Sequence, residues 1–273
     1  MKKILGIYSG TRQHRIGEGL LARTLFSQRT LGRHVSPFLL LDHVDPTFAA
    51  TLPAAAGACK SHAYSGCKML TMVRQGKMEY VDADGNRKII EAGDVQWMTV
   101  AEDGRPGQFQ PAGARRNDVV DMLQLWIDLP DSSSPSCPGR LSPEKVIAAK
   151  DVPVISLPDG GGRIRVIAGS CENHRGVMPT SSSFDIWELQ LKSRCMPELK
   201  TVAGRTLLLA ILSGSVMING DQSARSGEVV MLDRPGEGLF LETYANTTAL
   251  LLSGEPINAP GQTSLSVATT LQA

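Results

Sequence analysis

The 273-residue sequence has few aromatic residues, no long hydrophobic run and no excess of charge of one sign. Its 28 basic residues are balanced by 27 acidic ones, so no overall field favours nucleic acid or an anionic membrane. Apolar runs such as Leu207–Leu212 are far shorter than the roughly 20 residues that a membrane-spanning helix needs. The apolar start of the chain is interrupted at Ser9, before the core of a signal peptide could form. These absences predict a soluble, cytoplasmic protein that binds neither nucleic acid nor membranes directly.

Cysteine is also scarce, and the number of cysteines is odd. An odd number spread thinly through a chain without a secretion signal indicates reduced thiols rather than a disulfide framework. The five residues are Cys59, Cys67, Cys137, Cys171 and Cys195.

Turn-forming residues, in contrast, are abundant. The 27 glycines and 16 prolines favour many short strands over long helices. Asp82–Asn86 separates two β-rich segments and contains an Asp-Gly pair, which is a strong hairpin signal. Residues alternate in Asp121–Leu129 and again in Trp187–Lys192, as in strands with one strongly apolar face. The one helix that the sequence indicates is a short one starting near Ser142-Pro143-Glu144, with proline in its first turn.

The two halves of the chain repeat the same order of strand, glycine turn, hairpin, Gly-acid turn and strand. Gln75–Lys77 and Ala92–Asp94 mark the turns in the first half, and Ser213–Ser215 and Ser226–Glu228 mark them in the second. Two copies of a small antiparallel barrel or jelly roll explain this repeat better than one large sheet. A Ser/Pro-rich stretch provides the linker. The predicted divisions are an N-terminal domain 1–130, a linker 131–144, a C-terminal domain 145–257 and a polar tail 258–273.

Four segments resemble signature blocks of the pirin family: Ser36–His43, Gly93–Thr99, Leu123–Pro130 and Ser253–Pro256. The Gly-Asp-Val-Gln-Trp-Met-Thr block is specific, and the matches run in order from about residue 4 to 257. The resemblance implies an all-β bicupin, with two antiparallel β-barrel (jelly-roll) domains packed face to face. Members of the family are described as iron-binding nuclear transcription cofactors, as quercetin 2,3-dioxygenases and as bacterial regulators of metabolic enzymes.

The metal site of the family is where this chain departs from the resemblance. Pirins typically take metal ligands from a His-Pro-His-Arg-Gly-Phe-Glu segment and from a later His and Glu. The matching segment keeps His62 at the first ligand position and has Tyr64 at the second. Counted without gaps, the third and fourth positions fall on Pro106 and Gln108, and no histidine occurs between His62 and His174.

This departure argues against a bound catalytic metal. Iron or manganese in an oxygenase needs about three protein ligands, mostly histidine and carboxylate. One imidazole with a phenol and an amide holds an exchangeable divalent ion weakly, and Lys68 adds a positive charge near the site. No metal cofactor is therefore expected, although the resemblance implies Fe, Mn or Ni. If an ion does bind, the expected ligands are His62 with Cys59, Tyr64 or Gln108.

Two other uses of these residues remain open. Cys59, His62 and Cys67 have the thiolate and imidazole groups that bind zinc, but a fourth ligand is missing and Cys67 is interpreted as a small buried residue. Alternatively, Cys59 and Cys67 form a reversible disulfide, which would suit a redox sensor.

If the family fold holds without the metal, His62 and Tyr64 face the space that the metal would occupy, with Lys68 and Gln108 nearby. Trp97 is interpreted either as an apolar wall of this space or as core. A mainly apolar pocket with a few polar groups is a default binding site. This predicts a site for a small aromatic or anionic molecule.

Three functions are therefore compatible with the sequence. The first is a metal-free binding or regulatory bicupin, whose partner is an unknown protein or the small molecule just described. The second is a metal-dependent quercetin 2,3-dioxygenase, and the third is a cysteine-based redox sensor. The altered ligand positions favour the first, because function depends on the site rather than on the fold. His43 is interpreted as a core or turn residue rather than a catalytic one.

Overall fold

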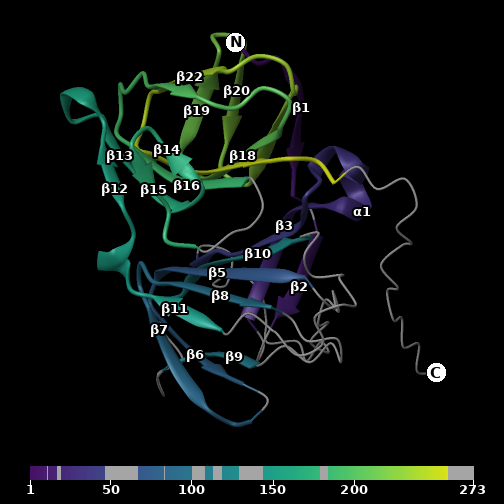
Figure 1. The fold of residues 1–273 in the computed structure, drawn as a ribbon, viewed down its shortest axis with the longest axis vertical. Helices are drawn as coiled ribbons and strands as arrows, with labels where there is room; N and C mark the ends of the chain where they lie inside the picture. The colour runs from purple at the N-terminus through teal and green to yellow at the C-terminus, as the bar shows by residue number, and fades with distance from the viewer. Residues whose placement is uncertain are drawn as a thin grey trace. The chain divides into compact units, whose positions relative to one another are not determined.

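The computed structural model describes residues 1–10, 12–16, 20–46, 67–82, 84–99, 108–112, 119–128, 144–178 and 184–257 (Figure 1). The chain divides into two compact units, each described by itself below. The N-terminal unit contains Gln13–Thr24 and Leu41–Ala148, and the C-terminal unit contains Met1–Arg12, Leu25–Leu40 and Ala149–Pro256. Within the described ranges, no helix has the length and apolar character needed to cross a membrane.

Two sheets build the N-terminal unit. The larger has the strand order β11-β8-β5-β10-β4-β3-β2, and the smaller has the order β7-β6-β9. The strands are β2 (Arg12–Ile16), β3 (Leu20–Ser27), β4 (Phe38–Val44), β5 (Lys68–Gln75), β6 (Lys77–Val81), β7 (Arg87–Glu91), β8 (Val95–Thr99), β9 (Gln108–Pro111), β10 (Asp121–Ile127) and β11 (Lys145–Ile147).

The C-terminal unit contains a seven-stranded sheet of order β1-β21-β18-β23-β16-β13-β12. A four-stranded sheet, β17-β22-β19-β20, and a hairpin of β14 and β15 complete it. The strands are β1 (Ile4–Ser9), β12 (Val154–Ser156), β13 (Gly162–Ala168), β14 (Ser170–Cys171), β15 (His174–Arg175), β16 (Phe184–Leu191), β17 (Glu198–Lys200), β18 (Thr206–Ser213), β19 (Ser215–Ile218), β20 (Gln222–Arg225), β21 (Glu228–Leu232), β22 (Gly238–Thr243) and β23 (Thr247–Gly254).

Helical segments are short in the part of the chain that the structure describes. They are the helix α1 (Gln28–Leu31) and the 3₁₀ turns Gly32–Val35, Ala149–Asp151 and Pro158–Gly160. The prediction of an all-β, duplicated architecture is therefore confirmed. Each unit combines a seven-stranded sheet with a smaller one, as in a jelly roll, rather than closing one continuous barrel.

The predicted Asp-Gly hairpin lies between β6 and β7, as its sequence requires. Asp82 Oδ1 accepts hydrogen bonds from the backbone N–H groups of Asp84 (2.9 Å) and Asn86 (2.8 Å). Together with the Asn86 side-chain amide, these bonds hold the pKa of Asp82 below its usual value. Gly85 has φ +83°, which a residue with a side chain rarely adopts. Local turn chemistry therefore fixes this hairpin.

The predicted short helix near Ser142 is wrong. Lys145–Ile147 is instead strand β11, with Val146 paired to Gln96 of β8. Glu144 accepts a hydrogen bond from Gln96 Nε2 (2.7 Å) and lies 3.1 Å from Lys88 Nζ. The pairing with β8 overrides the weak local capping signal.

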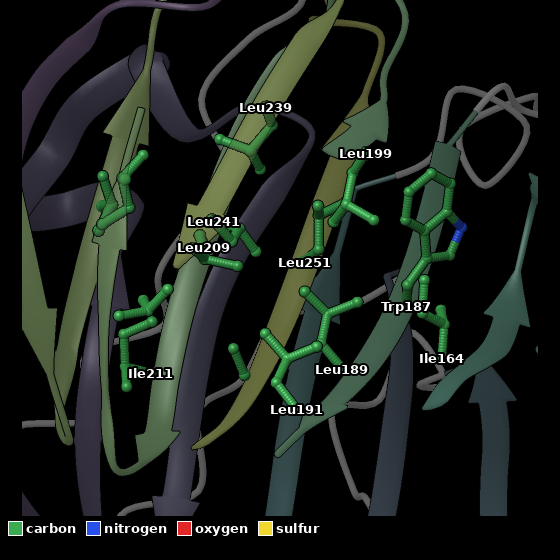
Figure 2. Packing of buried hydrophobic residues seen from close by; sticks show 14 of the residues in the cluster. Ile164, Trp187, Leu189, Leu191, Leu199, Leu209, Ile211, Leu239, Leu241 and Leu251 are labelled. Carbon is green, nitrogen blue, oxygen red and sulfur yellow. The ribbon is translucent and has the colours of Figure 1, made fainter. Parts of the chain in front are cut away.

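A large apolar cluster fills the C-terminal unit (Figure 2). Every second residue of β16, β18 and β23 contributes to this cluster. Trp187, Leu209 and Leu251 therefore lie on one face of the sheet. Leu209 and Leu251 have no exposed surface. All six residues of the apolar run Leu207–Leu212 are buried.

The first strand of the chain belongs to the C-terminal unit, which the sequence did not indicate. β1 pairs antiparallel with β21. Lys2 is 2% exposed, and its ammonium donates to the backbone oxygens of Asp233 (3.2 Å) and Arg234 (2.9 Å). Burial lowers the pKa of Lys2, although Asp233 opposes this shift. The Lys3 backbone N–H donates to Asp233 Oδ1 (2.7 Å), so both residues before the strand are anchored.

Candidate ligand site in the N-terminal unit

The structure describes part of the predicted site. Lys68 and Trp97 are described in full. Gln108 begins β9, where its backbone pairs with Val81 of β6. Three further predicted residues, Cys59, His62 and Tyr64, lie outside the described ranges, as does Pro106 at the third family position. The predicted grouping of these side chains therefore stays a prediction.

Lys68 stands at the start of β5, between two neighbouring strands. It lies opposite Thr99 of β8 and Ile127 of β10, and its Nζ donates a hydrogen bond to Thr99 Oγ1. Residues opposite each other in antiparallel strands point to the same face of a sheet. The partly buried Lys68 cation and the Thr99 hydroxyl therefore lie on one face, at the same end of the strands.

Trp97 lies on that face of the larger sheet as well. It pairs with Leu70, which is two residues beyond Lys68 and so has the same orientation. Trp97 is only 2% exposed and Leu70 is fully buried. The interpretation of Trp97 as core is confirmed. Its position two residues from Thr99 also places an apolar wall next to the polar end of the strands.

Cys67 and Asp128 lie next to Lys68 and Ile127 at the same strand ends, on the opposite face of the sheet. Each is adjacent in sequence to a residue of the Lys68–Ile127 pair, so each points away from the face of Lys68. Burial, with a smaller contribution from Asp128, raises the pKa of the Cys67 thiol to about 12. Burial also raises the pKa of Asp128. Cys67 is a free thiol with 1% exposure, as expected for a small buried residue.

We expect iodoacetamide to modify Cys67 slowly in the folded protein at mildly alkaline pH, because the thiolate is the reacting species. Replacement Asp128→Asn removes the charge that opposes thiolate formation, so it should lower the pKa of Cys67 and speed the modification modestly. Peptide mass spectrometry of time points measures both rates, with protein unfolded in urea as the control. Equal rates in folded and unfolded protein would contradict the burial of this thiol and support its use as a sensor.

Two buried hydrogen-bond networks in this unit were not apparent from the sequence. In the first, His43 Nε2 lies 3.0 Å from Asp121 Oδ1, and Arg74 donates to Asp121 Oδ2 at 2.8 Å. In the second, Asp42 Oδ1 accepts from the Thr24 hydroxyl (2.7 Å), and Asp42 Oδ2 lies 3.1 Å from a ring nitrogen of His14. The partners come from different strands, so no local spacing could reveal them.

His43 matches its interpretation as a core residue only in part. It is 1% exposed and bonded through Nε2, but its buried Nδ1 has no hydrogen-bond partner. In the described residues, no group of three or more histidine, cysteine, aspartate or glutamate side chains is arranged to hold a metal ion. His43 therefore belongs to a structural network.

The four ligand positions that the pirin resemblance implies carry different donors in this sequence. His62 offers an imidazole and Tyr64 a neutral phenol, whereas Pro106 has no side-chain donor and Gln108 has only an amide. The described residues of the same segment are the buried thiol Cys67 and the cation Lys68. This set has one imidazole and no carboxylate, whereas iron, manganese and nickel prefer several such ligands.

Comparison with known proteins shows which family the chain belongs to. The family model described as Pirin matches residues 20–127, and the one described as Pirin C-terminal cupin domain matches residues 186–263. A Pseudomonas aeruginosa protein, named as a candidate quercetin 2,3-dioxygenase, is 37% identical over 265 residues, which cover 95% of this chain and 89% of the relative. The chain belongs to the pirin family.

Solved structures agree with the pirin fold. A quercetin 2,3-dioxygenase of Acinetobacter baumannii is 31% identical with a TM-score of 0.77, covering 97% of this chain and 90% of that one. A bacterial pirin of Escherichia coli, solved in complex with nickel(II), has a TM-score of 0.62 at 16% identity, covering 92% of this chain and all (100%) of that one. The second likeness supports the fold alone. Pirin membership confirms the resemblance noted from the sequence.

Proposed function

We propose that this pirin is a metal-free bicupin that binds a small anionic or aromatic molecule in its N-terminal unit. The observation that carries the proposal is the Lys68 ammonium, held by Thr99 on the face that Trp97 lines. A lysine there attracts an anion and repels a divalent cation. The proposal extends to His62, Tyr64 and Gln108 as further contacts of the bound molecule.

The chemistry of these groups defines the kind of molecule. Lys68 supplies a positive charge and Thr99 a hydroxyl, and the buried side chains of Trp97 and Leu70 place apolar core beside them on the same face. A planar molecule with one acidic group matches both the polar groups and the apolar groups. Binding could then regulate an unidentified protein partner. The free thiols of Cys67 and two other cysteines suit the reducing cytoplasm in which we place the protein.

Quercetin 2,3-dioxygenase activity is the second candidate, favoured by the names of the Pseudomonas and Acinetobacter relatives. This activity needs a metal to polarise the flavonol and to manage dioxygen. The two candidates therefore differ in whether the protein carries a stoichiometric metal.

Metal content and quercetin turnover separate the two candidates. We expect protein purified without added metal to contain far less than one Fe, Mn or Ni ion per chain, and quercetin to be consumed at the uncatalysed rate. Elemental analysis and absorbance of quercetin measure these quantities. Stoichiometric metal that is lost in His62→Ala, with turnover that a chelator abolishes, would establish the dioxygenase instead.

A restored ligand set provides the matched control. The triple variant Tyr64→His, Pro106→His, Gln108→Glu rebuilds the ligands of the family on the same scaffold. Metal uptake by this variant and not by the parent attributes the loss to the ligands. In the parent, Lys68→Met should weaken binding of quercetin or another flavonol, measured by calorimetry, by about tenfold if one charged contact is lost. Unchanged affinity in Lys68→Met would remove the proposed role of this lysine.

A further inference from the structure

A cavity lies within the C-terminal unit and has no part in the proposed function. Its volume is about 540 Å³, within the range of small-molecule sites. Its walls come from the β14–β15 hairpin, the start of β16, the segment after β17 and Arg205. The cavity therefore lies at one end of the strands whose side chains form the apolar cluster.

Two buried donors at this cavity lack an acceptor. Trp187 is 4% exposed, and its indole Nε1 has no hydrogen-bond partner. Arg205 Nε is likewise buried and unpaired. Both nitrogens can only donate, so each would need an acceptor atom. A buried donor without an acceptor destabilises the folded protein, and a ligand that supplies the acceptor would remove that cost.

Trp187 faces two environments. Its ring belongs to the apolar cluster, and it also lines the cavity. Figure 2 shows the indole nitrogen on the side of the ring turned away from Leu199 and Leu251. The N–H edge therefore points away from the packed core, while the carbon edge contributes to it.

Two carboxylates hold Arg205 in place through its terminal nitrogens and not through Nε. Nη1 lies 2.9 Å from Asp185 Oδ2, and Nη2 lies 3.8 Å from Oε1 of the exposed Glu255. The other oxygen of Asp185 accepts from the Ser170 backbone N–H at 3.0 Å. Burial raises the pKa of Asp185, although Arg205 opposes the shift. Each oxygen of Asp185 therefore accepts a hydrogen bond from another group, and Arg205 Nε has no hydrogen-bond partner.

The exposed rim of the cavity adds positive charge. Arg175 and Lys200 lie there with His174, and Glu172 is the one acidic residue of the exposed rim among the described lining residues. The rim therefore favours an anion over a cation, and the interior holds the two unpaired donors beside the Asp185 carboxylate, whose charge Arg205 offsets. A carboxylate matches both features, since it is anionic and only accepts hydrogen bonds.

We propose that this cavity binds a small carboxylate, whose oxygens accept hydrogen bonds from Trp187 Nε1 and Arg205 Nε. Because Nε1 is shielded, the carboxylate must displace the side chains that cover it. The affinity should accordingly be modest, in the millimolar range. An apolar group on the ligand would pack on the Trp187 ring and Phe184.

Nitrogen-15 NMR of the full chain tests this directly, because the sequence has three tryptophans and so three indole N–H signals. The probes are acetate and benzoate, with benzyl alcohol as the uncharged control. We expect both carboxylates to move one indole signal saturably, and Trp187→Phe to remove that signal. Benzyl alcohol should leave it unmoved. The proposal is wrong if neither carboxylate shifts the Trp187 signal, or if benzyl alcohol does so equally.

Two variants separate binding from folding. Trp187→Phe keeps the ring in the core and loses the N–H, and Arg205→Lys keeps the charge beside Asp185 and loses Nε. Each should weaken benzoate binding by about tenfold in calorimetry. Lys150→Met, at an exposed lysine of the same unit that does not line the cavity, should leave benzoate affinity unchanged. The Trp187 indole signal reports on this cavity and not on the site near Lys68, so its response to benzoate distinguishes failure here from failure of the proposed function. Benzoate affinity that ignores both Trp187→Phe and Arg205→Lys, in variants with native melting temperatures, would overturn the assignment.

Discussion

Replacing Glu188 by Gln is expected to lower the free energy of unfolding by about 3–5 kcal/mol, the effect of breaking a buried ion pair. Glu188 is 1% exposed on β16, and its Oε2 lies 2.6 Å from Arg165 of β13. The two residues are directly opposite in the β13–β16 ladder. The substitution keeps the shape of the side chain but removes the carboxylate charge that pairs with the Arg165 guanidinium, which is 8% exposed. Urea unfolding followed by circular dichroism measures the loss.

Two controls show whether burial is the cause. Glu91→Gln makes the same change in the exposed pair with Lys77 and should alter stability little, because water screens that pair. The double variant Arg165→Met, Glu188→Leu removes both buried charges and should recover much of the loss. If the double variant is as unstable as Glu188→Gln, the loss comes from packing and the electrostatic explanation fails.

Truncating Leu209 to Ala is expected to lower the free energy of unfolding by about 2–5 kcal/mol. Leu209 has no exposed surface and lies on β18, between β21 and β23. Figure 2 places it beside Leu241 and across from Leu251. A strand bonded on both sides cannot move into the space left by the missing methyl groups, so most of the cavity should persist.

The same substitution at an exposed leucine is the matched control. Leu5 on the edge strand β1 is 55% exposed, so Leu5→Ala should change stability by less than about 0.5 kcal/mol. Leu209→Met conserves most of the volume and should lose less than about 1.5 kcal/mol. Similar losses for Leu209→Ala and Leu5→Ala would mean that this part of the core is not tightly packed.

The strands of this pirin were predictable because their signals are local. Alternation placed Trp187 and Leu189 on one face of β16, and turn residues set the ends of the β6–β7 hairpin. The polar residue of the same alternation, Glu188, nevertheless proved buried, so the second face of β16 is covered as well. Period-two alternation identifies the two faces of a strand, but it does not say whether both faces are covered.

The candidate sites were less predictable, because their groups come from distant parts of the chain. Lys68 and Trp97 were identified only through the pirin resemblance. The pairing of His43 with Asp121 joins residues 78 positions apart. Trp187 was expected on the apolar face, yet no pattern indicated that its N–H edge would lack an acceptor. Hydrogen-bond satisfaction depends on the whole fold around a group.

The pairing of β1 with β21 affects how this protein can be synthesised and dissected. Ribosomes make β1 first, yet its partner strand emerges more than 200 residues later, so the strand must wait unpaired through most of translation. A fragment that starts at the linker would lack β1 and expose β21 as a bare edge, open to pairing with another chain. Conversely, an N-terminal fragment would carry β1 without its sheet. Expression of the C-terminal unit alone should therefore succeed only when residues 1–12 are supplied, either fused to it or as a separate peptide.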